Sequence, residues 1–230
     1  MNLLECNNVE LIKNNQRILT DISFTIQSGD SIGIMGPSGS GKSSLLRLLN
    51  LLTSPTQGQI MYKNKNIQDY DPIELRRNIG YIPQKPYLFG TTVQENVTYP
   101  YELREQRPDF IEIHRYLDQL RLEKNILQKK NTALSGGEQQ RIALIRSLLM
   151  KPNIILLDEV TAALDEENTL LLEQFILQEQ HLHHLTLLFI THNLQQARRL
   201  GHKMLYLEAG RITFWGSVME FTKEKGEQNE

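Results

Sequence analysis

The sequence GPSGSGKS, which begins at Gly36, fits the phosphate-binding pattern G-x-x-x-x-G-K-[ST]. Its glycines permit a tight turn whose N–H groups point inward, at the start of a helix that attracts anions. The Lys42 ammonium can reach the β and γ phosphates of a nucleotide, and the Ser43 hydroxyl can bind the Mg²⁺ ion that accompanies them. The apolar run SIGIM precedes the pattern and the helix-like run SLLRLLNLL follows it. We therefore expect ATP or GTP to bind here.

Two adjacent carboxylates, Asp158 and Glu159, follow the apolar run IILL. Such a pair repels itself unless a cation or a reacting proton uses it. Beside a phosphate loop, we expect Asp158 to lie in the Mg²⁺ shell and Glu159 to polarise an attacking water molecule. His192 follows another apolar run and should emerge where a γ phosphate would lie. Taken alone, the carboxylates would fit a solvated turn and the histidine a structural hydrogen bond.

A second glycine-rich helix start, LSGGEQQR, spans residues 134 to 141. Ser135 and Glu138 have the spacing of a capping box, which accounts for the helix start but not for Gly136 and Gly137. The serine, the glycine amides and the helix dipole together make an anion site. The phosphate loop already serves the chain's own nucleotide, so the simplest remaining ligand is the nucleotide of another subunit. A twofold dimer would satisfy this reciprocally.

Three apolar runs must position these groups: SIGIM, IILLD and LTLLFITH, at residues 31–35, 154–158 and 185–192. Continuous apolar runs are typical of parallel strands that are buried on both faces. Ligands bind beyond the carboxyl ends of such strands, so the three strand ends should converge on one site. Near the N-terminus, DISFTI alternates in polarity and GQIMY follows a turn, which indicates a small antiparallel sheet.

A mostly helical insert lies between the first two buried runs. Within it, Asp109 can cap the helix that the sequence PDFIEIHRYLDQL predicts. The apolar residues of this helix recur at helical spacing and form one stripe, which we interpret as core packing. The stripe consists of Phe110, Ile113, Leu117 and Leu120.

Composition narrows the class of protein. The 230 residues, 40% of them hydrophobic and 23% charged, suit one globular domain. The net charge of −2 gives no global basic field, so we expect no nucleic-acid partner. Cys6 is the only cysteine, which excludes an internal disulfide and fits a reducing compartment. The N-terminus lacks the pattern of a signal peptide, and no apolar run approaches the ~20 residues of a membrane helix.

The order and spacing of these motifs resemble the ATP-binding cassette (ABC) family over nearly the whole chain. The matching segments are GPSGSGKS as Walker A, Gln84 in YIPQKPYLF as the Q-loop, LSGGEQQR as the signature, IILLDE as Walker B, AALD as the D-loop and His192 as the switch histidine. The resemblance implies an α/β P-loop NTPase with a RecA-like parallel-sheet core, an N-terminal antiparallel β subdomain and a helical subdomain. It divides the single domain 1–230 into a core lobe, about 1–84 and 151–230, and a helical subdomain, about 85–150.

The same resemblance implies a role for each motif residue. Glu159 and His192 are the expected catalytic residues, and Ser43, Gln84 and Asp158 the expected Mg²⁺ ligands. The expected ATP-binding residues are Gly36, Pro37, Ser38, Gly39, Ser40, Gly41, Lys42, Ser43, Ser44 and Gln84. The signature residues expected to act on a partner's ATP are Ser135, Gly136, Gly137 and Glu138, with Asp165 in the D-loop.

Three positions depart from the family pattern. An aromatic residue commonly stacks on adenine, whereas Ile12 or Lys13 stands at that place. The D-loop has Ala162 where serine is common, and Val160 replaces a usual proline. The first change puts stacking on adenine in question. The two D-loop changes put communication between the two nucleotide sites of a dimer in question.

The expected function is ATP binding and hydrolysis for an ABC transporter, with ATP and Mg²⁺ as cofactors. The chain would form a homodimer and join a separate transmembrane permease, at the inner face of the cell membrane on the cytoplasmic side. Tyr87, Leu88 and Phe89 lie in the segment where this family docks its permease. Their apolar side chains fit an exposed protein interface or, equally, core packing.

The segment LFGTTVQENVTYPYELREQRPD also resembles small ATPases of iron export. A soluble ABC ATPase of DNA repair or translation control is the alternative. A third possibility, a nucleotide switch without turnover, is disfavoured by Glu159. The cluster of His181, His183 and His184 is more typical of an exposed helix end than of a metal site.

Overall fold

The computed structural model describes residues 2–226 and contains two β-sheets. The first sheet is antiparallel, with strand order β2-β1-β4-β5. Its strands are β1 (Asn2–Lys13), β2 (Gln16–Gln27), β4 (Gln57–Tyr62) and β5 (Lys65–Asn66). Ile22, Phe24 and Ile26 are buried on one face of β2, which confirms the antiparallel sheet predicted from the alternation in DISFTI.

The second sheet has the strand order β10-β9-β3-β8-β7-β6. All of its neighbouring strands are parallel except β10, which pairs with β9 in the antiparallel sense. Its strands are β3 (Ser31–Met35), β6 (Ile79–Ile82), β7 (Ile154–Asp158), β8 (Thr186–Ile190), β9 (Lys203–Glu208) and β10 (Arg211–Ser217). The three predicted strands therefore form and pair in the parallel sense, with β8 ending two residues before His192.

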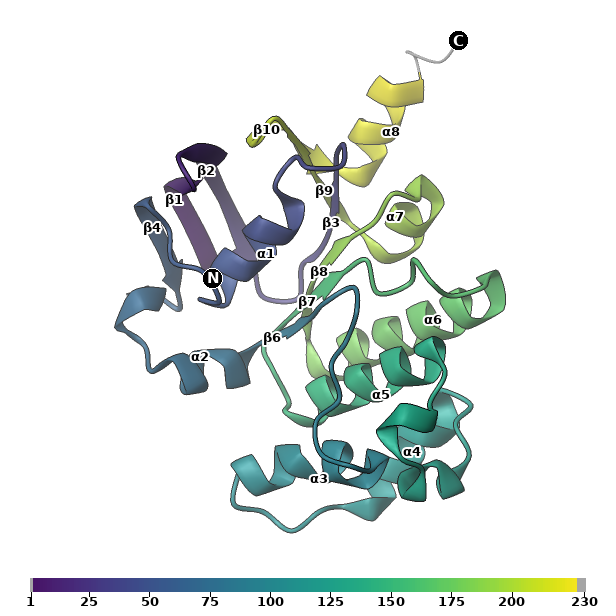
Figure 1. The fold of residues 1–230 in the computed structure, drawn as a ribbon. Coiled ribbons are helices and arrows are strands. Elements are labelled where there is room, and N and C mark those ends of the chain that lie inside the picture. The colour runs from purple at the N-terminus through teal and green to yellow at the C-terminus, as the bar shows by residue number, and fades with distance from the viewer. Residues whose placement is uncertain (1, 227–230) are drawn as a thin grey trace.

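Eight α-helices and three short 3-10 helices complete the described chain. The α-helices are α1 (Lys42–Leu49), α2 (Pro72–Asn78), α3 (Val93–Leu103), α4 (Phe110–Gln119), α5 (Gly136–Leu149), α6 (Glu166–His183), α7 (Leu194–Leu200) and α8 (Val218–Gly226). The 3-10 helices are η1 (Ile67–Asp69), η2 (Lys124–Gln128) and η3 (Asn131–Ala133). Figure 1 shows α3 to α6 on the side of the parallel sheet that lies away from the antiparallel sheet.

The parallel strands are buried on both faces, as their continuous apolar sequence predicts. One face of β7, with Ile154 and Leu156, packs in a core that includes α1 and the antiparallel sheet. The other face, with Ile155 and Leu157, packs against a core built from the helices α3 to α6. The carboxyl ends of β3, β7 and β8 consequently meet at one edge of the sheet, where the predicted motifs begin.

The helices after β6 agree with the predicted helical insert, with one correction. Asp109 caps α4 by accepting hydrogen bonds from the N–H groups of Ile111 and Glu112. Ile113 and Leu117 of the predicted stripe are buried, but Phe110 is 40% exposed. Phe110 is the first residue of α4, so its side chain lies at the end of the stripe, beside the ring of His114. The division into a core lobe and a helical subdomain remains a prediction.

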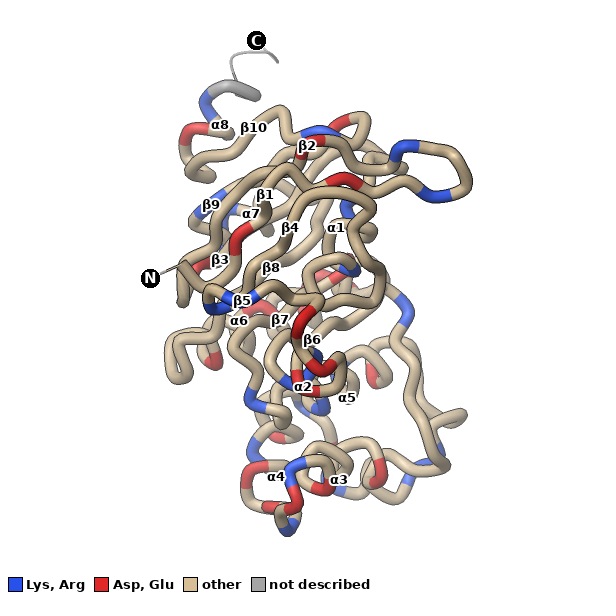
Figure 2. The backbone as a smooth tube through the Cα atoms, turned by 90° about the vertical axis from the view of Figure 1, so that its left-hand side faces the viewer, with Lys and Arg blue, Asp and Glu red and all other residues tan. Residues whose placement is uncertain are grey.

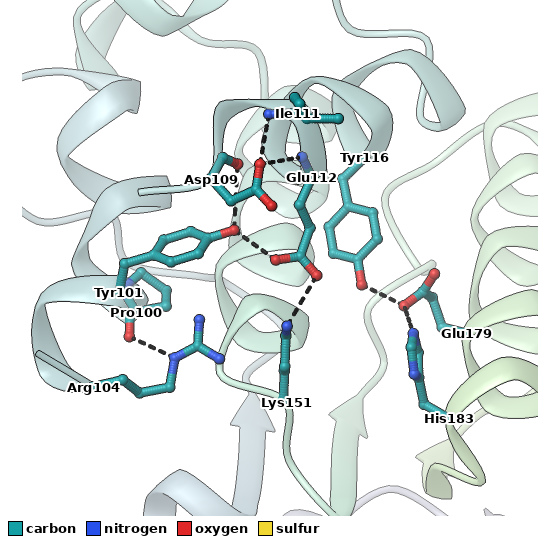
Figure 3. A network of polar contacts seen from close by, with 10 residues as sticks. All are labelled: Pro100, Tyr101, Arg104, Asp109, Ile111, Glu112, Tyr116, Lys151, Glu179 and His183. Atoms are coloured by element: carbon teal, nitrogen blue, oxygen red, sulfur yellow. Dashed lines mark hydrogen bonds and ion pairs between the residues drawn. The ribbon is translucent and has the colours of Figure 1, made fainter. Parts of the chain in front are cut away.

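A network of polar contacts ties the helical insert to α6 and to the loop before β7 (Figure 3). The Tyr101 hydroxyl of α3 donates a hydrogen bond of 2.7 Å to Glu112 of α4, which also lies 3.4 Å from Lys151 Nζ. The Tyr116 hydroxyl donates to the buried Glu179 of α6. The hydrogen bonds of the network fix the orientation of α4 on the core.

Among the described residues, no helix is long and apolar enough to span a membrane. Lys and Arg positions are interspersed with Asp and Glu positions along the backbone, as Figure 2 shows. Cys6 lies in β1 and is 1% exposed.

Candidate functional site

The phosphate loop connects β3 to α1, and close packing requires glycine at positions 36 and 41. Gly36 has φ +145°, and a Cβ atom there would lie 1.9 Å from the Leu207 carbonyl oxygen. Gly41 has φ +104°, a conformation that other residues rarely adopt. The loop borders a pocket of about 450 Å³. The residues that line it are Ile18, Ser38, Gly39, Gly41, Lys42, Ser43, Ser44, Gln84 and Glu159.

The Lys42 ammonium lies within the loop. It donates hydrogen bonds of 2.9 and 2.8 Å to the carbonyl oxygens of Gly36 and Pro37. Burial lowers the pKa of Lys42, and the nearby Glu159 and Asp158 carboxylates oppose that shift. The Ser40 hydroxyl is also buried, and it has no hydrogen-bond partner in the described part of the chain. Lys42 lines the pocket, so the loop places a cationic side chain where an anion could bind.

Both oxygens of Asp158 accept hydrogen bonds at the end of β7. The Ser43 hydroxyl donates to Oδ1 over 2.9 Å, and the Tyr81 hydroxyl donates to Oδ2 over 2.8 Å. Burial raises the pKa of Tyr81 to about 12, so its hydroxyl stays protonated and acts as the donor at neutral pH. A serine hydroxyl beside a carboxylate is a set of hard oxygen donors, and the amide of Gln84 lies at the same pocket. This chemistry fits Mg²⁺.

Glu159 lies between Gln84 and His192. Gln84 Nε2 donates a hydrogen bond of 2.8 Å to one carboxylate oxygen, and His192 Nε2 lies 2.9 Å from the other. Glu159 has φ 52°, a left-handed conformation that is uncommon outside glycine and that often occurs at functional sites. It lines the phosphate-loop pocket and also a second cavity of about 570 Å³, which Ala162 and Leu164 border.

The signature helix α5 begins with the predicted capping box. The Ser135 hydroxyl accepts from the Glu138 N–H, and the Glu138 carboxylate accepts from the Ser135 N–H. Ser135 and Gly136 are exposed, and a Cβ atom at Gly136 would have no neighbour within 4 Å. None of the described residues that line the phosphate-loop pocket belongs to this segment. The start of α5 is therefore open to another molecule.

The D-loop leads into α6. Asp165 is exposed and caps α6 by accepting a hydrogen bond from the Asn168 N–H. Val160 is 8% exposed and packs in the helical core, whereas Ala162 is exposed beside Glu159 in the second cavity. The core therefore accommodates a valine at this position.

Sequence reasoning missed two residues of the site. Tyr81 follows the apolar start of β6, and nothing in its spacing indicates a bond to Asp158 across the sheet. Ile18 lines the phosphate-loop pocket but is not among the site residues that the sequence predicts. Ile18 belongs to the β2 strand, and its carbonyl oxygen lies close to Gly41, so packing of the antiparallel sheet on the phosphate loop places it there.

An apolar groove of about 500 Å³ lies on the surface between α2, β6, α3 and α5. Ile73 and Tyr87 are its most exposed large apolar residues, at 60% and 77%. Of the three apolar residues in the segment where the resemblance places the permease contact, Tyr87, Leu88 and Phe89, only Tyr87 is exposed. Leu88 packs against the helical core, and Phe89 stacks edge-on against Tyr99.

The histidine cluster at the end of α6 has structural contacts. His183 Nε2 lies 3.5 Å from the Glu179 carboxylate, and His184 ends the helix in a left-handed conformation. The part of the chain that the structure describes holds no group of three or more His, Cys, Asp or Glu side chains arranged for a metal ion.

Comparison with known proteins identifies the family. Residues 19–162 match the model of the family described as ABC transporter. The chain is 37% identical over 191 residues to the "Probable iron export ATP-binding protein FetA" of Escherichia coli, covering 83% of this chain and 85% of that protein. It is 34% identical to the phosphate import ATP-binding protein PstB of Saccharolobus solfataricus, covering 94% of this chain and 89% of that protein.

A solved structure with the same fold is an ATP-binding cassette captured as a dimer in a post-hydrolysis state with ADP and Pi. It superposes with a TM-score of 0.84 at 29% identity, over 94% of this chain and 98% of that one. The chain described here belongs to the ABC transporter family. It is an ATP-binding and ATP-hydrolysing subunit that supplies energy for transport.

Proposed function

We propose that Glu159 is the general base of ATP hydrolysis in this chain. Its carboxylate lies at the pocket of the phosphate loop, where an attacking water molecule would approach the γ phosphate. The contacts from Gln84 and His192 support this role, because they orient the carboxylate from two sides. His192 would in turn face the γ phosphate once that phosphate occupies the pocket.

The remaining pocket residues would bind the nucleotide and its metal ion. Lys42 and the N–H groups of the loop would hold the phosphates. Ser43, Gln84 and Asp158 are the proposed ligands of Mg²⁺, which when bound neutralises charge on the phosphates. The hydrogen bond between Ser43 and Asp158 supports this assignment, because it brings two of the three ligands together.

The exposed start of α5 supports a homodimer in which each signature contacts the ATP of the partner. Ser135 and Gly136 are exposed, and neither lines the chain's own phosphate-loop pocket. An isologous interface would make this contact twice. Asp165 and the cavity beside Glu159 would lie near the same interface.

The apolar groove between α2 and α3 is the proposed docking site for a separate membrane-spanning permease, which would hold the chain at the cytoplasmic face of the membrane. Exposed Ile73 and Tyr87 support this, because apolar side chains grouped in a groove favour burial against a partner. The groove also contains Arg76, Arg77 and Arg146 but no carboxylate among the described lining residues. An apolar helix with an acidic or polar edge would complement it.

Membrane pull-down tests the permease proposal. Tagged Glu159→Gln, which should retain bound ATP, is recovered from gently solubilised membranes, alone and combined with Tyr87→Asp. Tyr87 is 77% exposed, so the substitution should leave the fold intact. Ile111→Asp is the matched control, because Ile111 is an 84% exposed apolar residue outside the groove.

We expect a multi-span membrane protein to be recovered with Glu159→Gln alone and when Ile111→Asp is added. It should not be recovered when Tyr87→Asp is added. Recovery of ribosomes or DNA, or equal recovery of the membrane protein with both aspartate variants, would contradict the proposal. Iron export stays a prediction for this chain, since relatives named for iron export and for phosphate import match it similarly.

A further inference from the structure

Tyr81 belongs to none of the predicted motifs, yet its side chain contacts a motif residue at the site. It is half-buried in β6, the strand beside β7, and its hydroxyl donates to Asp158 Oδ2 at 2.8 Å. Arg47 Nε of α1 donates to the Tyr81 oxygen at 3.4 Å. The hydroxyl therefore accepts from an arginine and donates to a carboxylate, so its orientation is fixed.

The Asp158 carboxylate has few other restraints. It is 4% exposed, and among the described residues its side-chain partners are the hydroxyls of Ser43 and Tyr81. If the Ser43 oxygen serves a metal ion, the Tyr81 hydroxyl is the side-chain contact that keeps the carboxylate from turning. A buried carboxylate that loses one of its two hydrogen bonds turns toward another partner or binds water, so its orientation is no longer fixed.

We propose that Tyr81 is a positioning residue that orients the Asp158 carboxylate toward the Mg²⁺ site, an inference that rests on the ligand roles proposed above. Tyr81 is also one of the residues that line the apolar groove between α2 and α3. Tyr81 therefore lies at both the proposed permease site and the proposed metal site.

Binding of Mn²⁺ tests this role without relying on activity. Mn²⁺ is titrated into the full chain with the non-hydrolysable analogue AMP-PNP, and the bound ion is measured by electron paramagnetic resonance. Tyr81→Phe removes only the hydroxyl. Tyr101→Phe is the matched control, because the Tyr101 hydroxyl also donates to a carboxylate, that of Glu112, outside the nucleotide site. Affinity for AMP-PNP is measured separately in EDTA.

We expect the Kd for Mn²⁺ to rise about tenfold in Tyr81→Phe, as for loss of one hydrogen bond to a charged group. The Kd for AMP-PNP in EDTA should change less than about twofold, and Tyr101→Phe should resemble the wild type in both measurements. Unchanged Mn²⁺ affinity in Tyr81→Phe, with the wild type binding normally, overturns the inference alone. Equal weakening in Tyr81→Phe and Tyr101→Phe also overturns it, because a general loss of structure would explain both. A wild type that binds AMP-PNP but no Mn²⁺ overturns the proposed metal site itself.

Discussion

Removal of Arg199 should destabilise the protein, because it leaves a buried carboxylate without its main partner. The Glu173 side chain is 3% exposed, and Arg199 donates two hydrogen bonds to it, at 2.6 and 2.9 Å. Gln196 donates a third, at 2.9 Å, and also donates to the hydroxyl oxygen of Thr161, two residues after Glu159. The pair therefore fastens α7 to α6.

The expected loss of stability depends on how deeply the Arg199 and Glu173 side chains are buried. Breaking a fully buried ion pair costs about 3–5 kcal/mol. The Arg199 side chain is 41% exposed, so water can partly replace it, and the Gln196 hydrogen bond remains. We expect Arg199→Ala to lower the free energy of unfolding by about 2 kcal/mol. For a chain of this size that corresponds to a fall in Tm of about 4–8 °C.

Thermal and urea unfolding of four variants tests this reasoning. Arg198→Ala is the matched control, because the neighbouring Arg198 is exposed and has no ion pair among the described residues. Glu173→Gln removes the buried charge, so adding it to Arg199→Ala should restore part of the lost stability. An Arg199→Ala variant as stable as Arg198→Ala would refute the estimate. A double variant less stable than Arg199→Ala would refute the role of the unpaired charge.

Two further outcomes follow from the structure. Cys6 is 1% exposed, and burial raises the pKa of its thiol. A thiol-specific disulfide reagent should therefore react with Cys6 only after the chain is unfolded in urea. Rapid stoichiometric reaction with the folded chain would contradict this expectation. The hydrogen bond from the Ser135 N–H lowers the pKa of Glu138 in the folded chain. The ionised carboxylate therefore stabilises the fold at pH values above its unfolded-state pKa of about 4.3. This stabilisation is lost as the pH falls through the lower folded-state pKa. Thermal melts should show wild type more stable than Glu138→Gln at pH 6, with the difference shrinking below about pH 4; a difference independent of pH would count against the capping box.

The parts of the site that the sequence predicts are those encoded by local pattern. SIGIM and IILLD become strands with the predicted bounds, because a continuous apolar run has only the sheet interior in which to bury both faces. Ser135 and Glu138 form the predicted capping box because its geometry involves only four residues.

The parts that escaped prediction depend on packing between distant segments. Tyr81 reaches Asp158 because β6 and β7 are neighbours, although 77 positions separate the two residues in the chain. Ile18 borders the pocket because the antiparallel sheet packs on the phosphate loop. Phe110 has the spacing of a core residue, but its place at the first turn of α4 leaves it at the edge of the core.

The measurement that tests the account most directly is the molar mass of Glu159→Gln by size-exclusion chromatography with light scattering, with and without ATP and Mg²⁺. Blocking hydrolysis at the proposed base should trap two ATP molecules between two chains. We expect twice the 26.6 kDa of one chain in ATP, one chain without it, and one chain in both conditions when Ser135→Arg is added. A Glu159→Gln chain that stays monomeric at saturating ATP, or an ATP-dependent dimer that Ser135→Arg leaves intact, would contradict the proposed ATP-bound dimer.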